Sequence, residues 1–150
     1  PNRSVCASFP PRSPPSADRC MDPLGDAEEA GLTADPRFQA AVAQFNAGAW
    51  YACHDGFEEL WHETQGPSRR VLQGILQIAV AHHHLERGNQ RGATVLLGEG
   101  LGRLRGFGAV HFRLDLDHLR TTAAARLQAL QSGTDPAPLP QPVLQPCSEV

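Results

Sequence analysis

The feature that most constrains this chain is a helical hydrophobic period, interrupted at intervals by residues that end helices. Asp35 is a typical N-cap residue, and Pro36 after it suits the first helical position. The triplet Asn46-Ala47-Gly48 ends that helix, and Gln65-Gly66-Pro67 and Gly88-Asn89 mark two later ends. No segment alternates with the period of two that a strand requires. The pattern predicts an all-α fold, a compact bundle of about five helices built from antiparallel helical hairpins.

The five expected helices cover residues 36–46, 50–63, 68–87, 91–105 and about 115–132, with Ser68 as the cap of the third. A weak echo at a spacing of 40 residues aligns Gly48 with Gly88 and Cys53 with Ala93. Such an echo is typical of tetratricopeptide-like hairpins. It also arises whenever a helical hairpin needs a glycine turn and a small packing residue, so both interpretations stay open.

Proline marks the expected limits of the folding unit. Of 13 prolines, 11 lie before residue 24 or after residue 135. We expect a disordered or non-native flank over 1–34, a helical domain over 35–131 and a proline-rich disordered tail over 132–150. Met21 is a candidate start of the native protein. If residues 1–20 are instead a transit segment, as their arginines and serines suggest, the location is a plastid; otherwise we expect a cytoplasmic protein.

Composition excludes several classes of protein. No run of 18 apolar residues exists, which argues against a membrane span. The cysteine spacing fits neither a zinc ribbon nor a disulfide scaffold. Residues 35–131 hold 10 arginines and 9 acidic residues, a net charge of +1 that offers no general field for nucleic acid.

The second expected helix carries a candidate site at the border of its apolar face. His54 and Glu58 are four residues apart and therefore lie one above the other, with Tyr51 and Trp61 alongside. A histidine and a glutamate at this spacing can share a divalent metal or form a hydrogen-bonded acid–base pair. They can equally be a surface pair at the edge of the core.

The third expected helix is apolar over most of its circumference, which predicts a central, buried position. A polar stripe nevertheless runs along it, formed by Gln73, Gln77 and His84. Buried amides and imidazoles need partners, and the short loop after the second helix predicts antiparallel packing of the two helices. We expect a composite site between them with these residues: His54, Glu58, Gln73, Gln77, His84, Tyr51 and Trp61.

The run His82-His83-His84 is not expected to bind one ion, because successive helical residues turn by about 100°. His82 and His83 share the phase of the core residues, whereas only His84 shares the polar stripe. The expected metal ligands are therefore His54, Glu58 and His84, with a divalent metal as the candidate cofactor.

An ordered series of motifs resembles the domain of unknown function 309 family over about residues 38–105. The series comprises Phe45 to Asp55, Glu58 to Trp61, Gln73 to Ala79, His84 to Asn89 and Gly92-Ala93. The resemblance implies a small all-α domain, marks His54, Glu58, Gln73, Gln77 and His84 as motif positions, and implies no reaction. The His-Asp form and Leu96 to Gly100 look most like cyanobacterial and plastid-lineage members. Asp55 stands where many relatives carry glutamate.

Three hypotheses follow for function. The first is a module that binds a protein or small-molecule partner in a polar pocket between the second and third helices. The second is a metal-dependent hydrolase that uses the His54, Glu58 and His84 ligands. In the third, the polar stripe is a satisfied network that fixes helix packing. The sequence leaves the oligomeric state open.

Overall fold

The computed structural model describes residues 23–147, and within them six helices pack against one another beside one small hairpin. The all-α prediction is confirmed. The elements, in chain order, are α3 (Pro23–Ala34), α4 (Pro36–Asn46), α5 (Trp50–Glu63), α6 (Ser68–Glu86), α7 (Gln90–Leu104), β2 (Val110–His111), β3 (Leu114–Asp115) and α8 (Leu116–Gln131).

The helix ends follow the capping residues. Asp35 accepts a hydrogen bond from the backbone N–H of Arg37 at 2.8 Å, and Pro36 opens α4. Asp115 caps α8 in the same way. Gly48 and Gly88 end α4 and α6 with φ of 77° and 80°, a conformation that glycine adopts without strain. The prediction that Ser68 caps α6 is wrong, because Pro67 occupies the N-cap position and Ser68 is the first helical residue.

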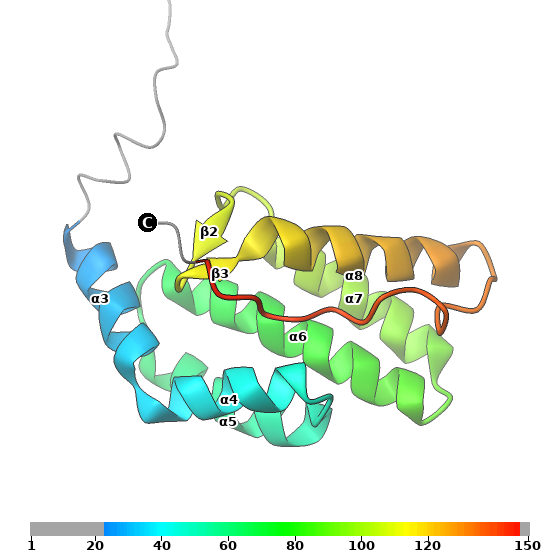
Figure 1. The fold of residues 1–150 in the computed structure, drawn as a ribbon, viewed down its shortest axis with the longest axis horizontal. Helices are drawn as coiled ribbons and strands as arrows, with labels where there is room; N and C mark the ends of the chain where they lie inside the picture. The colour runs from blue at the N-terminus through cyan, green and yellow to red at the C-terminus, as the bar shows by residue number, and fades with distance from the viewer. Residues whose placement is uncertain (1–22, 148–150) are drawn as a thin grey trace, which may run out of the picture.

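Consecutive helices pack side by side, so that α6 lies between α5 and α7 at the centre of the bundle (Figure 1). The approach of α6 to α7 depends on two glycines. A Cβ on Gly100 would lie 2.9 Å from the carbonyl oxygen of Gly74, closer than real Cβ atoms come. Gly74 on α6 and Gly100 on α7 thus allow the two backbones to approach closely.

The C-terminal segment corrects the expectation of a disordered tail for residues 132–147. This segment runs back across the bundle, beside α8 (Figure 1). Leu144 is buried in the core, and the side chain of Asn46 forms hydrogen bonds with both of its backbone groups. The guanidinium of Arg126 donates to the carbonyl oxygens of Leu139 and Pro140. Proline-rich composition predicted disorder, but backbone carbonyls and one leucine bind the segment to the helices.

Helix α3 also lies in a stretch that we expected to be disordered or non-native. Leu32 is buried against the core, and two neighbouring glutamates attach the helix to the bundle. Glu28 accepts a hydrogen bond from the N–H of Gly66, and Glu29 accepts one from the N–H of Phe112, both at 2.7 Å. Met21 and the transit segment considered for residues 1–20 lie outside the described residues.

The hairpin of β2 and β3 was not expected, because each strand has only two residues and no alternation can be read from it. Val110 pairs with Asp115 and His111 with Leu114. Phe112 and Arg113 form the turn with φ of 55° and 59°, where glycine or asparagine is usual.

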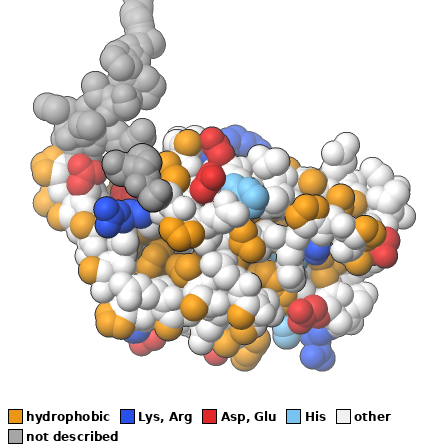
Figure 2. Space-filling view, viewed as in Figure 1, with side chains coloured by type: hydrophobic (Ala, Val, Ile, Leu, Met, Phe, Trp, Pro, Cys, Tyr) orange, Lys and Arg blue, Asp and Glu red, His pale blue; other side chains and the backbone are white. Residues whose placement is uncertain are grey.

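The surface shows no single-sign charge field on the face drawn in Figure 2, where acidic and basic side chains are scattered among apolar and neutral ones. Within residues 23–147, no helix combines the length and the apolar character that crossing a membrane requires.

Candidate functional site

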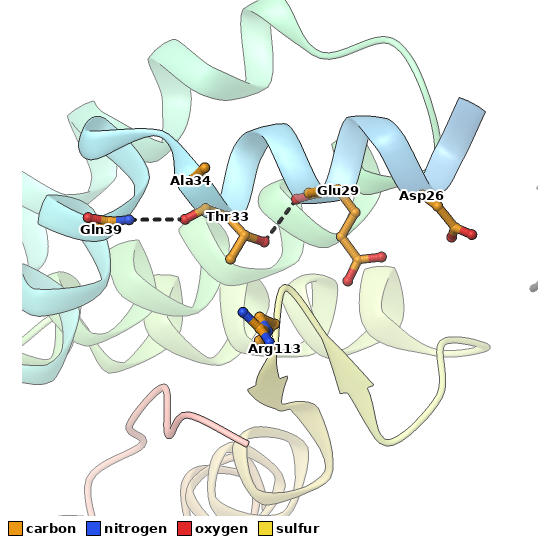
Figure 3. A pocket seen from close by; sticks show the side chains of 7 residues that line it. Asp26, Glu29, Thr33, Ala34, Gln39 and Arg113 are labelled. Atoms are coloured by element: carbon orange, nitrogen blue, oxygen red, sulfur yellow. Dashed lines mark hydrogen bonds between the residues drawn. The ribbon is translucent and has the colours of Figure 1, made fainter. Parts of the chain in front are cut away.

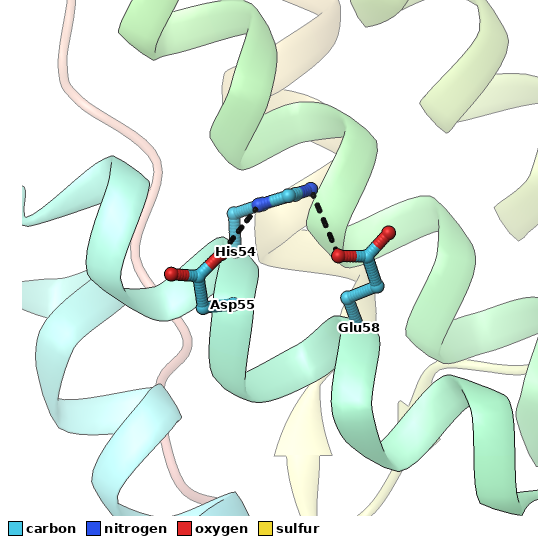
Figure 4. A group of neighbouring side chains, drawn as sticks. All are labelled: His54, Asp55 and Glu58. Carbon is cyan, nitrogen blue, oxygen red and sulfur yellow. Dashed lines mark ion pairs between the residues drawn. The ribbon is translucent and has the colours of Figure 1, made fainter.

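Helix α5 places one imidazole and two carboxylates together. Its apolar face is buried and consists of Trp50, Cys53, Phe57 and Leu60. At the border, His54 Nδ1 lies 3.3 Å from Asp55 Oδ1, and His54 Nε2 lies 3.9 Å from Glu58 Oε1 (Figure 4). The His54 side chain is 23% exposed, and both carboxylates are more open. The imidazole therefore lies between two acidic groups at the border of the buried face.

These three side chains form the group within residues 23–147 that fits a metal ion. One ligand atom from each lies within 4.8 Å of the others. An imidazole nitrogen and two carboxylate oxygens are a ligand set that zinc accepts, and three protein ligands leave a position for water. Asp55 was missing from the expected set, because neighbouring residues of a helix project about 100° apart. Its side chain nevertheless reaches the near nitrogen of His54.

Tyr51 lies beside this group, as expected, and it also contacts His83 of α6, which was not expected there. Its ring centroid lies 6.1 Å from that of His54 and 5.5 Å from that of His83 on α6. His83 was expected in the core, yet it is half-buried at this edge. The Tyr51 ring is 63% exposed and is one of the largest apolar groups that the described chain presents to solvent.

Trp61 lies on the same side of α5, one helical turn beyond Glu58. The guanidinium carbon of Arg69 lies 4.0 Å from the centroid of its ring, a cation–π contact between the two ends of the α5–α6 connection. We name the surface that carries these groups the α5–α6 edge; it consists of Tyr51, His54, Asp55, Glu58, Trp61, Arg69 and His83.

Gln77, in the middle of the polar stripe of α6, faces α7 rather than α5. Gln77 donates to Glu99 at 3.2 Å and accepts from Arg103 at 3.3 Å, and both partners belong to α7. Gln73 is half-buried on the same stripe. The structure therefore does not bring Gln77 to His54 and Glu58, because α7 covers the side of α6 on which the stripe lies.

His84 lies at the end of α6, away from the acidic group. Its Nδ1 is 3.3 Å from the side-chain nitrogen of Asn89, the N-cap residue of α7. It is not part of the group that fits a metal. The expected set of His54, Glu58 and His84 is thus replaced by His54, Asp55 and Glu58.

Two buried titratable groups are unsuited to catalysis. Burial raises the pKa of the Cys53 thiol to about 12, so no reactive thiolate forms near neutral pH. Burial also lowers the pKa of His82 to about 4, and this imidazole donates through Nδ1 to the carbonyl oxygen of Ile78. Both groups fill the core, as the helical phase predicted for His82.

Sequence reasoning missed a second polar group around the hairpin. Ser68 lies 3.0 Å from His111 Nε2, and a Glu29 oxygen lies 3.9 Å from the same nitrogen. These residues come from α6, β2 and α3, and they line a cavity of about 240 Å³. No local pattern could predict the group, because its members are far apart in sequence and α3 itself was not expected.

The described cavities lie beside α3 and between α8 and the C-terminal segment, whereas the α5–α6 edge presents its polar groups on the surface. Residues 38–96 match the family described as Domain of unknown function (DUF309). No protein with a curated description matches the chain.

Proposed function

Because residues 38–96 match DUF309, a domain of unknown function, the match names no activity. We propose that this protein is a binding module and that its partner binds at the α5–α6 edge. One observation carries the proposal: the 63% exposed ring of Tyr51 stands beside a cluster of one imidazole and two carboxylates. Exposed tyrosines combine a large apolar area with a polar tip, and they are enriched at protein interfaces.

The chemistry of the edge selects a partner with positive charge. Asp55 and Glu58 supply two carboxylates within a few ångströms, and the face of Tyr51 can accept a cation. Trp61 already forms such a cation–π contact with Arg69, at 4.0 Å. An arginine of the partner could contact Tyr51 in the same manner. A protein segment that carries arginine or lysine next to an apolar residue fits these groups best.

Site-specific crosslinking tests the proposal. A photoreactive phenylalanine analogue in place of Tyr51 is expected to capture a discrete partner in native cell extract. The same analogue in place of Val95, which is 53% exposed on α7, is the matched control. The Asp55→Asn/Glu58→Gln double variant should lose the Tyr51 product. Equal capture at both positions, or a product that survives neutralisation of both carboxylates, contradicts the proposal.

A metal-dependent hydrolase is the second candidate, and the geometry of His54, Asp55 and Glu58 favours it. Their ligand atoms lie within 4.8 Å of one another. A divalent ion held by three such ligands keeps an open position, where it can lower the pKa of a bound water. Since His84 lies elsewhere, Asp55 would take the third ligand position.

Calorimetric titration with Zn²⁺ separates the two candidates. The metal candidate requires about one ion per chain and at least tenfold weaker binding in His54→Ala. The His62→Ala variant is the control, since His62 is exposed on the same helix outside the cluster. Absence of saturable binding excludes the hydrolase and leaves the binding module in place.

Gln77 belongs to the third alternative, a network that fixes packing. Its amide joins Glu99 and Arg103 of α7, so we assign it to the α6–α7 contact rather than to a ligand. Replacing Gln77 should change the melting temperature and leave the crosslinked product at position 51 unchanged.

A further inference from the structure

The hairpin turn places two non-glycine residues in the left-handed region of the described backbone. Phe112 and Arg113 both have left-handed φ values, 55° and 59°, and neither is glycine or asparagine. Non-glycine residues keep such a conformation only where surrounding contacts impose it, and they cluster at functional sites.

Contacts to Phe112 stabilise its left-handed conformation. Its ring is 1% exposed and packs on Phe38, with ring centroids 4.9 Å apart. Its N–H donates to Glu29 at 2.7 Å. These contacts account for Phe112 but not for Arg113, whose side chain is exposed. Among residues 23–147, no hydrogen bond or ion pair holds the Arg113 guanidinium.

Arg113 instead lines a cavity of about 500 Å³ between the hairpin tip and α3 (Figure 3). Helix α3 contributes the carboxylates of Asp26 and Glu29 to the lining, and Glu29 also accepts from the N–H of Phe112. Thr33 is fixed by donating to the carbonyl oxygen of Glu29 at 2.8 Å, and Gln39 donates to the carbonyl oxygen of Thr33 at 3.3 Å. The cavity thus has a cationic wall, an anionic wall and a hydrogen-bonded side.

We propose that this cavity binds a small amino carboxylate, whose carboxylate meets Arg113 and whose ammonium group meets Asp26 and Glu29. A guanidinium presents paired donors that match a carboxylate. The volume lies in the range typical of small-molecule sites. A ligand with only one charge would interact favourably with one of the two walls, whereas an amino carboxylate would interact with both. Apart from Gln39, the lining residues lie outside residues 38–96, and none of them belongs to the α5–α6 edge.

Titration with a homologous series of probes tests the proposal. The series is glycine, β-alanine, γ-aminobutyrate and ε-aminocaproate, and propionate and propylammonium are the single-charge controls. At least one amino carboxylate should bind ten times more tightly than either control. Arg113→Gln and Asp26→Asn should each weaken that probe at least tenfold. Arg105→Gln, which removes another exposed arginine, should not.

The Arg113→Gly variant separates a binding role from a structural one. Glycine relieves the left-handed strain, so the melting temperature should rise while binding of the amino carboxylate falls at least tenfold. The backbone oxygen of Arg113, which accepts from the N–H of Cys147, is kept. Loss of stability in this variant, unchanged binding in it, or a probe series no tighter than propionate overturns the proposal.

Discussion

The side-chain amide of Asn46 pairs with both backbone groups of Leu144, donating to its carbonyl oxygen at 3.0 Å and accepting from its N–H at 2.7 Å. The two residues are 98 positions apart in the sequence. The last turn of α4 therefore acts as the anchor of the C-terminal segment, and Leu144 enters the core beside it.

We expect Asn46→Ala to lower the free energy of unfolding by about 1–3 kcal/mol, because it leaves two backbone groups of a buried residue without partners. Hydrogen exchange should accelerate at Leu144 before it accelerates in α6. Gln145→Ala removes a neighbouring exposed side chain and should leave both measurements unchanged. Equal exchange rates in both variants would mean that the segment is held by other contacts.

The contact between α6 and α7 predicts opposite effects for two alanine substitutions in one helix. A Cβ at Gly100 would lie 2.9 Å from the Gly74 oxygen and 3.0 Å from an Ile78 side-chain carbon, so Gly100→Ala should destabilise by about 1–3 kcal/mol. Gly98 has open space, and Gly98→Ala should stabilise by roughly 0.5–1 kcal/mol through helix propensity. Chemical denaturation measures both; effects of the same sign contradict this account of the contact.

His82 should make stability fall in mild acid. Burial, with a smaller contribution from the charge of Arg126, lowers its pKa from 6.5 to about 4 in the folded state. Above pH 6.5 the imidazole is neutral in both states and has no effect. Between pH 6.5 and 4 the unfolded chain takes up a proton that the folded chain does not, and the free energy of unfolding falls by up to about 3 kcal/mol. Below pH 4 this contribution becomes constant.

Denaturation curves at a series of pH values measure this slope. His82→Leu should flatten it over that window, whereas His62→Gln, on the exposed side of α5, should leave it in place. A slope that persists in His82→Leu would have to come from other groups.

The attachment of α3 depends on its glutamates. Glu28→Ala removes the acceptor of the Gly66 N–H, a charge-assisted bond of 2.7 Å, and should weaken the docking of α3 by about 1–3 kcal/mol. Amides of α3 should lose protection from hydrogen exchange while those of α6 keep theirs. Asp26→Ala removes an equal charge from the first turn of the helix and is the control. Uniform loss of protection across the bundle would show that α3 is not a separate unit.

Local signals predicted the five central helices well. The bounds Trp50–Glu63 match the expected second helix, because an aromatic start and the Gln65-Gly66-Pro67 end are both local. The same logic failed for Leu144 and α3. Their burial depends on partners such as Asn46 and Gly66, 98 and 38 residues away, and composition alone carries no information about those partners.

The candidate site was predictable only in part, for a geometric reason. A helical wheel gives the direction of Gln77 on α6, but it does not say which neighbour lies in that direction. The structure places α7 there, so Gln77 and His84 contact Glu99 and Asn89 and are not part of the site expected beside His54. His54, Glu58 and Tyr51 remain together because they belong to one helix, and Asp55 joins them through side-chain length.

Both ends of the described chain are tied to one hairpin. Glu29 of α3 holds the N–H of Phe112, and the N–H of Cys147 donates to the carbonyl oxygen of Arg113 at 2.7 Å. The chain therefore enters and leaves at the same end of the bundle (Figure 1). A pulling force applied at Glu29 and Cys147 would act on the backbone of this turn from both sides. Polypeptides joined directly at residues 23 and 147 would therefore both lie at this end of the bundle (Figure 1).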